Sequence, residues 1–360
     1  VYAAVTPATR RTTDLVTICG GGVYRKSGSE WSAVGDDGSV SLQSSGIIRT
    51  QQAYQKLWIA DGYGYKVYDP LAGTGSDLED WEATAGTLPY GSSGDTYTIV
   101  DFDADANPIT VDATHASNFS AGDVIVLSGA ANTTNNGSYT VVSDSESGGD
   151  TDIVVAEGPR VDASGSDVGT VQIANNAASI IALYRGRIVL SGVAGDPQNW
   201  FMSAVGDPLN WDYFPATTSA TQAVAGNASD AGLLGDVVTA LCPYSDDLMV
   251  IGCDHTLWMM RGDPAAGGVI DNVSYQTGIA SPDAWTWDPF GNLWFFGQGT
   301  LWKMSMGGTP EPVSRSRLDR AFQAINIATN NIRLTWDTLH YGLHIWVTPL
   351  LEPSETITHY

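Results

Sequence analysis

The sequence is poor in cations, and this scarcity limits the partners that the chain can bind. Its 360 residues contain 16 Lys and Arg against 40 Asp and Glu, which gives a formal net charge of −24. Tight binding of a nucleic-acid backbone requires cations that meet the phosphates, so we do not expect this chain to grip DNA or RNA. An acidic surface would instead favour solubility and repel DNA that passes close to it.

Cysteines and long apolar runs are also scarce. The three cysteines, Cys19, Cys242 and Cys253, are odd in number and share no metal-ligand spacing, so we expect buried free thiols rather than a disulfide framework. No apolar run approaches the ~20 residues of a membrane span, and no signal peptide is visible. The chain begins without Met and stops inside an expected strand, so we expect it to be a portion of a longer polypeptide.

Helical periodicity is nearly absent, whereas turn-forming and β-forming residues are abundant. The chain contains 40 Gly and 12 Trp, and 43% of its residues are hydrophobic. This composition favours an all-β protein with many tight turns and a substantial core. The one stretch with helical spacing, in which Leu318, Phe322 and Ile325 recur at i, i+4 and i+7, predicts a short helix with Ser314 or Ser316 as its N-cap.

A short apolar run followed by a turn and an aromatic-bearing run recurs six times. The runs begin at Leu15, Leu57, Ile188, Leu248, Leu293 and Leu343, with separations of 42, 131, 60, 45 and 50 residues. Each pair of runs predicts a β-hairpin whose first strand is buried on both faces. When the atypical segment 91–173 is left out, the long separation becomes 48 residues. A period near 45–50 residues predicts a β-propeller of about six or more four-stranded blades, with a large β-sandwich as the alternative.

The segment 91–173 differs from the rest of the chain. It contains none of the 12 Trp, and it carries 13 acidic residues against one basic residue, Arg160. Alternating apolar positions around turn signals such as Asn-Asn-Gly at 135–137 predict strands. We therefore expect three parts: the first propeller blades in 1–90, an inserted small β-barrel or sandwich in 91–173, and the remaining blades in 174–360, the last of them truncated.

Candidate metal sites are weak. Asp101, Asp103, Asp105, Asn107 and Asp112 fall at positions 1, 3, 5, 7 and 12 of a loop that resembles a calcium-binding loop, but position 6 is not Gly and the flanks read as strands. A polar hairpin turn explains this spacing better, so Asp101, Asp103 and Asp105 are a weak metal candidate and we expect no cofactor.

Histidine and aromatic pairs invite a functional interpretation, and each also has a plain structural one. His340 and His344 lie four residues apart on an expected strand, with no carboxylate or cysteine expected nearby, and so predict ordinary strand histidines. Trp285 with Trp287, and Trp58 with Tyr63 and Tyr65, could stack on sugars, but packing in the blade core is the default explanation. No nucleophile motif, P-loop or dinucleotide fingerprint occurs, so we expect no enzymatic activity.

The phrase Gly-Asp-Pro-x-Asn-Trp occurs at 195–200 and again at 206–211, and a third Gly-Asp-Pro occupies 262–264. Proline with φ near −65° suits a turn, and the preceding Asp can hydrogen-bond to the turn backbone. The Trp would then anchor the chain to the sheet. The phrases predict structural turns, with the residues Asp196, Pro197, Trp200, Asp207, Pro208 and Trp211.

The second phrase, "FMSAVGDPLNWDYF" at 201–214, follows "ALYRGRIVLSG" at 182–192 and precedes "VVTALCPYSDDLMVIGCDHTLWMMRGDP" at 237–264. This arrangement resembles the tail nozzle proteins of short-tailed bacteriophages, also called tail tubular protein B-like or tail hub proteins. The resemblance covers about 180–320 well and the flanking blades loosely. It implies a virion structural protein, a propeller that forms a homo-oligomeric ring, usually a hexamer, beneath the portal and adaptor.

The same resemblance implies partners: the tail adaptor protein, tail fibre proteins, and DNA that transits the channel without specific binding. The acidic charge suits a conduit that must not hold DNA. Two alternatives remain at the level of sequence. One is a carbohydrate-binding propeller, an adhesin or receptor-binding module, and the other is a propeller glycoside hydrolase with two carboxylates at one end of the propeller.

Overall fold

The computed structural model describes residues 2–5, 13–19, 21–34, 42, 48–72, 77–89, 96–102, 108–115, 118–119, 124–130, 135, 137–155, 169–173, 177–315, 318–350 and 358–359. The chain divides into two compact units. Unit 1 consists of Val1–Val40, Ser44–Pro89 and Ala177–Tyr360, and unit 2 consists of Ser41–Gln43 and Tyr90–Asn176. Unit 2 thus contains the segment 91–173 that the sequence sets apart.

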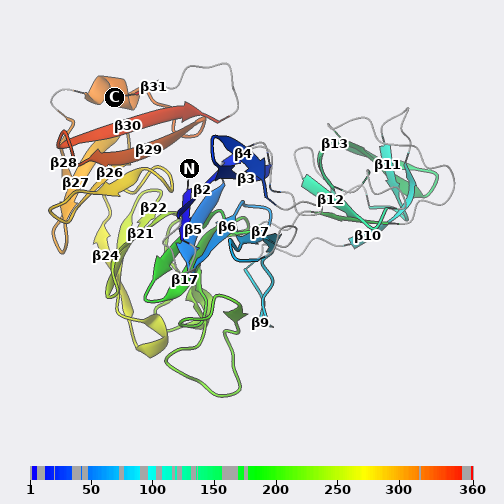
Figure 1. Ribbon diagram of the computed structural model, residues 1–360, viewed down its shortest axis with the longest axis horizontal. Coiled ribbons are helices and arrows are strands. Elements are labelled where there is room, and N and C mark those ends of the chain that lie inside the picture. Colours follow the sequence, from blue (N-terminus) through cyan, green and yellow to red (C-terminus); the bar gives the residue numbers. More distant parts are fainter. Residues whose placement is uncertain are drawn as a thin grey trace. The chain divides into compact units, whose positions relative to one another are not determined.

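Unit 1 is an all-β propeller whose described residues form six antiparallel sheets, which we call blades 1–6 (Figure 1). Blade 1 contains β1 (Tyr2–Val5), β2 (Thr13–Cys19), β3 (Gly22–Ser27) and β4 (Glu30–Ala33). Blade 2 contains β5 (Arg49–Ala53), β6 (Lys56–Ala60), β7 (Tyr65–Tyr68) and β8 (Leu78–Asp80). Blade 3 contains β16 (Ile180–Tyr184), β17 (Arg187–Val193), β18 (Asp196–Met202) and β20 (Val224–Ala225).

The remaining blades follow the same meander order. Blade 4 contains β21 (Val238–Ser245), β22 (Leu248–Cys253), β23 (Leu257–Arg261) and β24 (Val269–Ser274). Blade 5 contains β25 (Trp285–Trp287), β26 (Asn292–Gly297), β27 (Thr300–Ser305) and β28 (Glu311–Pro312). Blade 6 contains the three strands β29 (Asn330–Asp337), β30 (Gly342–Pro349) and β31 (Thr358–His359).

The six recurring apolar runs form the second strands of the six blades, as the sequence predicts. They correspond to β2, β6, β17, β22, β26 and β30. All but the first residue of β22 are buried, and Leu57 of β6 lies directly opposite Tyr68 of β7. A strand that packs against a neighbouring blade on both faces requires continuous apolar side chains, and this is why the runs are visible in the sequence.

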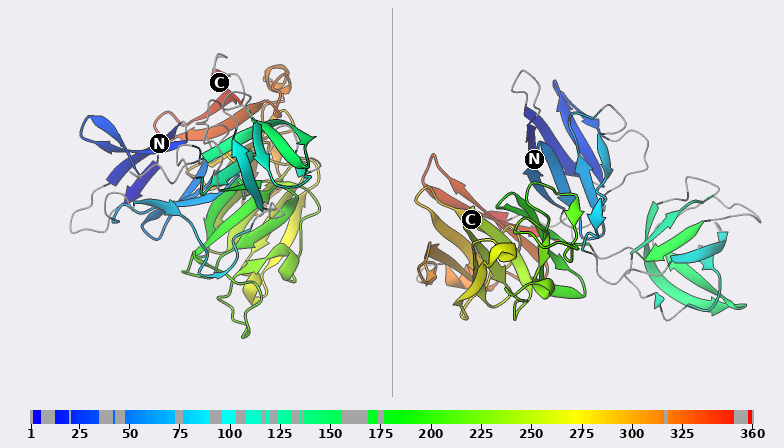
Figure 2. Two further views of the ribbon diagram at one scale, coloured as in Figure 1. Left: turned by 90° about the vertical axis from the view of Figure 1, so that its right-hand side faces the viewer. Right: turned by 90° about the horizontal axis from the view of Figure 1, so that it is seen from below.

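Blades 2 to 6 pack against one another in chain order through clusters of buried apolar side chains. Figure 2 shows the ribbons of the blades from two further sides. One cluster joins Trp58 of blade 2 to Ile188 of blade 3, and a second joins Met202 of blade 3 to Ile251 of blade 4. A third joins blades 4, 5 and 6 and includes Phe295 and Phe296 of β26. The first strands of neighbouring blades also contact one another, as in the pairs β5 with β16, β16 with β21, and β25 with β29.

Unit 2 is a closed six-stranded barrel with the strand order β10-β11-β14-β13-β12-β15. Its strands are β10 (Thr96–Phe102), β11 (Pro108–Val111), β12 (Val124–Ser128), β13 (Gly137–Ser147), β14 (Asp150–Val155) and β15 (Thr170–Ile173). Its interior is filled by side chains such as Ile99, Ile109, Ile125 and Ile153. The first and last strands pair with each other, and Thr96 lies opposite Gln172.

Two details of the sequence prediction are wrong. The predicted short helix forms as α1 (Asp319–Gln323), but Leu318 rather than Ser314 occupies its N-cap position, and no side chain caps it. The Ser314 hydroxyl accepts a hydrogen bond from the Leu301 amide at 3.0 Å, and Ser316 lies outside the described residues. The described residues also include the short 3-10 helices η3 (Gly226–Ala228) and η4 (Pro264–Ala266). Cys242 and Cys253 are buried, but Cys19, at the end of β2, is exposed. Within the described residues, no helix has both the length and the apolar character needed to cross a bilayer.

Candidate functional site

The three Gly-Asp-Pro phrases each begin with a glycine in the left-handed region of backbone space. The φ angles are +88° at Gly195, +74° at Gly206 and +70° at Gly262. A residue with a Cβ atom rarely adopts such angles, so each glycine allows a sharp change of chain direction. The shared feature of the three phrases is thus a backbone bend at the glycine, and the aspartate that follows has a different partner in each phrase.

Asp207 and Asp263 hydrogen-bond to their own turns, whereas Asp196 does not. The Asp207 carboxylate accepts from the Leu209 amide, and the Asp263 carboxylate accepts from the Ala265 amide, both at 3.0 Å. Asp196 accepts instead from the Asn199 side-chain amide at 2.7 Å. Asp196 and Pro197 both lie in β18, so they are not turn residues, and a two-residue hairpin turn ends just before them.

The tryptophans of the two full phrases are fully buried anchors. The Trp200 indole donates to the carbonyl of Gly232 at 3.1 Å, and the Trp211 indole donates to the carbonyl of Pro208 at 2.9 Å. Trp211 belongs to β19 (Asn210–Trp211), which pairs in parallel with β9 (Ala85–Gly86). Its ring also lies 5.7 Å from that of Trp81. The second phrase thus fastens the connection between β18 and β20 to the segment that follows blade 2.

The third phrase supplies the partner of a buried cation. Arg187, the first residue of β17, has a side chain that is 1% exposed. Its Nε and Nη2 atoms donate to the Asp263 carboxylate at 3.2 and 3.0 Å. Asp263 belongs to the connection that follows β23, so this ion pair joins blade 3 to blade 4. We call it the Arg187–Asp263 clamp.

Backbone carbonyls satisfy the other donors of this guanidinium. Nη1 donates to the carbonyls of Ser203 and Gln222, the former at 2.8 Å, and Nη2 also donates to the carbonyl of Ala220 at 3.0 Å. Burial lowers the pKa of Arg187, and the Asp263 carboxylate acts in the opposite direction. The arginine remains charged because its ordinary pKa lies far above neutrality, and the clamp also fixes both ends of the connection between β18 and β20.

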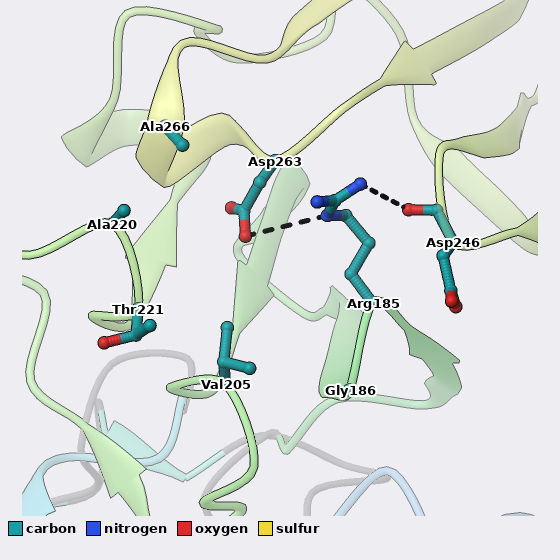
Figure 3. Close-up of a pocket in the computed structure, with 8 residues that line it drawn as sticks. All are labelled: Arg185, Gly186, Val205, Ala220, Thr221, Asp246, Asp263 and Ala266. Carbon is teal, nitrogen blue, oxygen red and sulfur yellow. Dashed lines mark hydrogen bonds and ion pairs between the residues drawn. The ribbon is translucent and has the colours of Figure 1, made fainter.

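An open cavity of about 520 Å³ lies beside the clamp (Figure 3). The Arg185 guanidinium lies between Asp263 and Asp246, donating to the Asp246 carbonyl at 2.7 Å and lying 3.8 Å from the Asp263 carboxylate. The rest of the lining consists of Gly186, Val205, Ala220, Thr221 and Ala266. Arg185 also pairs with Asp247. The Arg185 and Asp263 side chains of this wall are therefore both engaged in protein contacts, whereas Asp246 contacts Arg185 through its carbonyl. This arrangement suits a joint between blades.

Most of the weak metal candidate lies outside the described residues. Asp101 is exposed at the end of β10, whereas Asp103 and Asp105 lie outside the described residues. Asp112 accepts a hydrogen bond from the Thr98 amide at 3.1 Å, as a residue of an ordinary hairpin does. Within the described part of the chain, no three His, Cys, Asp or Glu side chains are arranged to hold a metal ion.

The expectation that His340 and His344 lack a carboxylate neighbour is wrong. The Asp337 carboxylate lies 2.6 Å from His340 Nδ1 and 3.4 Å from His344 Nε2. His344 Nδ1 in turn lies 2.8 Å from His359 Nε2. His340 belongs to the turn between β29 and β30 rather than to a strand. Asp337 precedes His340 by three residues, so the spacing Asp-x-x-His-x-x-x-His could have revealed this cluster.

The aromatic pairs considered as sugar platforms are largely internal. Trp58 and Tyr65 are each 2% exposed. Trp285 and Trp287 are half-buried, and their indoles donate to the carbonyls of Pro282 and Pro243 at 2.8 and 3.1 Å. Blade packing therefore accounts for these four residues.

Comparisons with known proteins give no family for this chain. No family model matches it, and no curated protein matches it. Among solved structures, it is similar to Hsv2 of Kluyveromyces lactis, at 12% identity and a TM-score of 0.36 over 93% of this chain and 86% of that one. It is also similar to a catalytically inactive virginiamycin B lyase from Staphylococcus aureus with quinupristin, at 11% identity and a TM-score of 0.35, over 87% and 88% of the two chains. For the endosialidase of phage phi92 the identity is 12% and the TM-score 0.25, over 98% of this chain and 53% of that one. These TM-scores are too low for the similar structures to indicate a function for the chain.

Proposed function

We propose that this chain is a structural β-propeller of a bacteriophage tail, a nozzle or hub subunit without enzymatic activity. The observation that supports the proposal most directly is the Arg187–Asp263 clamp. Its two residues fall within the stretches that carry the resemblance to tail nozzle proteins, namely 182–192 and 237–264. In this structure those residues join neighbouring blades, which suits a family whose shared phrases are structural.

The charge of the chain supports the same role. A net charge of −24 with only 16 Lys and Arg suits the wall of a channel through which DNA must slide without being held. We therefore assign the chain to the tail of the virion. The proposed assembly is a homo-oligomeric ring, a hexamer, in contact with the tail adaptor and tail fibre proteins.

Cryo-electron microscopy of the purified protein, or of the particle that contains it, tests this proposal. The expected result is a closed ring of propellers, coaxial with a portal when the whole particle is imaged. A closed ring is also expected as a discrete oligomeric mass in solution. A protein that remains monomeric at high concentration, and that joins no ring when mixed with its adaptor, would contradict the proposal.

The carbohydrate-binding alternative predicts glycan binding by a protein that forms no ring. It requires exposed aromatic platforms, but Trp58 and Tyr65 are buried in the blade core. Binding to a glycan array by a monomeric protein would favour this alternative. A ring that binds no glycan would favour the nozzle.

A further inference from the structure

Blade 6 differs from blades 3 and 4 in the pattern of burial along its second strand. β17 and β22 are buried along nearly their whole length. In β30, by contrast, Ile345 and Val347 are buried, whereas Trp346 between them is 38% exposed. Such alternation marks a strand with one covered face and one face that is open to solvent. We call the face that carries Trp346 the open face of blade 6.

The register of the three strands places a carboxylate and two imidazoles on the open face. Residues that lie opposite each other in antiparallel strands share a face, and Trp346 lies opposite His359 of β31. His344 precedes Trp346 by two residues and therefore points to the same side of the sheet. Asp337 lies opposite Gly342, which belongs to the same side. The His344 side chain is 39% exposed, so an ion from solvent can reach it.

The carboxylate and the two imidazoles form a chain of contacts with the His344 ring at its centre. Asp337 Oδ2 lies 3.4 Å from Nε2 of this ring, and His359 Nε2 lies 2.8 Å from its Nδ1. A carboxylate beside Nε2 favours the tautomer with the proton on that nitrogen, which leaves the lone pair of neutral His344 on Nδ1, facing His359. A histidine that binds a metal through one nitrogen commonly donates to a carboxylate through the other.

Both ends of this chain of contacts are held in place. The His359 ring stacks on that of Trp346, with ring centroids 4.1 Å apart and an angle of 15° between the planes. The Asp337 carboxylate lies 2.6 Å from His340 Nδ1 and accepts from the Leu339 amide at 2.8 Å. Groups that already have defined positions lose little conformational entropy when a ligand binds.

We propose that His344 Nδ1 and His359 Nε2 are the protein ligands of a divalent transition-metal ion of the nickel, copper or zinc type. Imidazole nitrogen suits ions of this class, whereas Ca²⁺ and Mg²⁺ prefer oxygen ligands. The ion takes the place of the proton between the two rings, and His359 then carries its proton on Nδ1. Within the described residues no group of three His, Cys, Asp or Glu side chains is arranged as a metal site, so water completes the coordination. This proposal does not depend on the role in a phage tail.

The two rings need to move little to accept the ion. With Zn–N bonds of about 2.0–2.1 Å, two nitrogens on a tetrahedral ion lie about 3.3–3.4 Å apart. The two nitrogens are now 2.8 Å apart, so the rings must separate by about 0.5 Å to reach that geometry. The pairing of β31 with β30 joins Trp346 to His359 and Val347 to Thr358. A bound ion would therefore fasten a short strand to its neighbour.

Isothermal titration calorimetry of zinc chloride into the purified full chain tests the proposal, at about pH 7.5, where imidazole is mostly neutral. The protein carries no polyhistidine tag, because a tag would itself bind zinc. The expected result is saturable binding of one zinc ion per chain, with no binding of calcium. His344→Gln and His359→Gln should each abolish the binding, and Asp337→Asn should weaken it by about tenfold or more.

A matched variant and a second measurement separate the site from general metal binding. The His255 side chain is 68% exposed and belongs to blade 4, so His255→Gln should leave zinc binding unchanged. Zinc should also slow hydrogen exchange of the β31 amides in the original chain but not in His359→Gln. Far-ultraviolet circular dichroism shows whether each variant is folded.

Three results would overturn the proposal. The folded chain could fail to bind zinc, in which case the two histidines are an ordinary hydrogen-bonded pair. Binding that survives in the double variant His344→Gln with His359→Gln would place the ion elsewhere. One zinc ion per two chains, lost in either single variant, would show that two copies supply the ligands and would contradict a site within one chain.

Discussion

Replacing Asp263 by alanine should destabilise the propeller more than any change to its exposed charges. The substitution leaves the guanidinium of Arg187, 1% exposed, without the carboxylate that accepts from Nε and Nη2 at 3.2 and 3.0 Å. The carbonyls of Ser203, Ala220 and Gln222 still accept hydrogen bonds, but they do not neutralise the charge. Removal of one partner of a buried ion pair costs about 3–5 kcal/mol.

Two further variants divide this loss into charge and hydrogen bonding. Asp263→Asn keeps an oxygen that can accept from Arg187, so we expect a loss of about 1–3 kcal/mol. Asp247→Ala breaks the exposed pair with Arg185, in which Asp247 is 80% exposed, and should cost less than about 1 kcal/mol.

Urea unfolding followed by tryptophan fluorescence provides the measurement. All 12 Trp lie outside 91–173, so the signal reports unit 1 alone. A loss below about 1 kcal/mol for Asp263→Ala, equal to that of Asp247→Ala, would refute the reasoning. The Arg187 charge would then not depend on Asp263.

Three other measurements test separate features. Iodoacetamide at neutral pH should label the exposed Cys19 but neither buried thiol until the protein unfolds. Burial raises the pKa of Cys253 to about 12 and that of Cys242 well above its ordinary value, so neither forms the reactive thiolate. Mass spectrometry of the labelled peptides shows which cysteines react. Hydrogen bonds from the His340 side chain and from the turn amides lower the pKa of Asp337 in the folded state, so its contribution to stability is complete above its unfolded pKa of about 4 and is lost as the pH falls further. The protection factors of the amides at the β29–β30 turn, which correct for the pH dependence of intrinsic exchange, should therefore fall below pH ~4. An equal fall in Asp337→Asn would contradict this assignment. Replacing 91–175 with a short Gly-Ser linker should preserve the tryptophan emission spectrum, and a red shift to that of unfolded protein would show that the barrel is needed for the propeller to fold.

The sequence revealed the second strand of each blade because that strand has a demanding environment. β17 and β22 are buried on both faces, and continuous apolar side chains mark them. The outer strands are short and partly exposed, as in β28, Glu311–Pro312, and carry no comparable signal. The parallel pair β9 with β19 joins Ala85 to Asn210, and a contact between residues so far apart in sequence leaves no local pattern.

The sequence indicates each residue of the Arg187–Asp263 clamp separately but not their pairing. An arginine at the start of the apolar run 187–193 indicates a buried cation that needs a carboxylate, and the third Gly-Asp-Pro contains an Asp with no assigned partner. Arg187 and Asp263 lie 76 residues apart, however, so spacing alone could not pair them. Ser314 shows the opposite error: its hydroxyl suits an N-cap, but a strand amide of blade 5 binds it instead.

The pairing of β10 with β15 has a consequence for how such a protein can change. Thr96 in the first strand of the barrel lies opposite Gln172 in its last strand, so the two ends of the barrel segment lie close together. A module with neighbouring ends can be lost, gained or exchanged by recombination without stretching the chain that carries it. About half of the net negative charge travels with this module. One recombination event could therefore change the electrostatic character of the protein while the six blades keep their sequence.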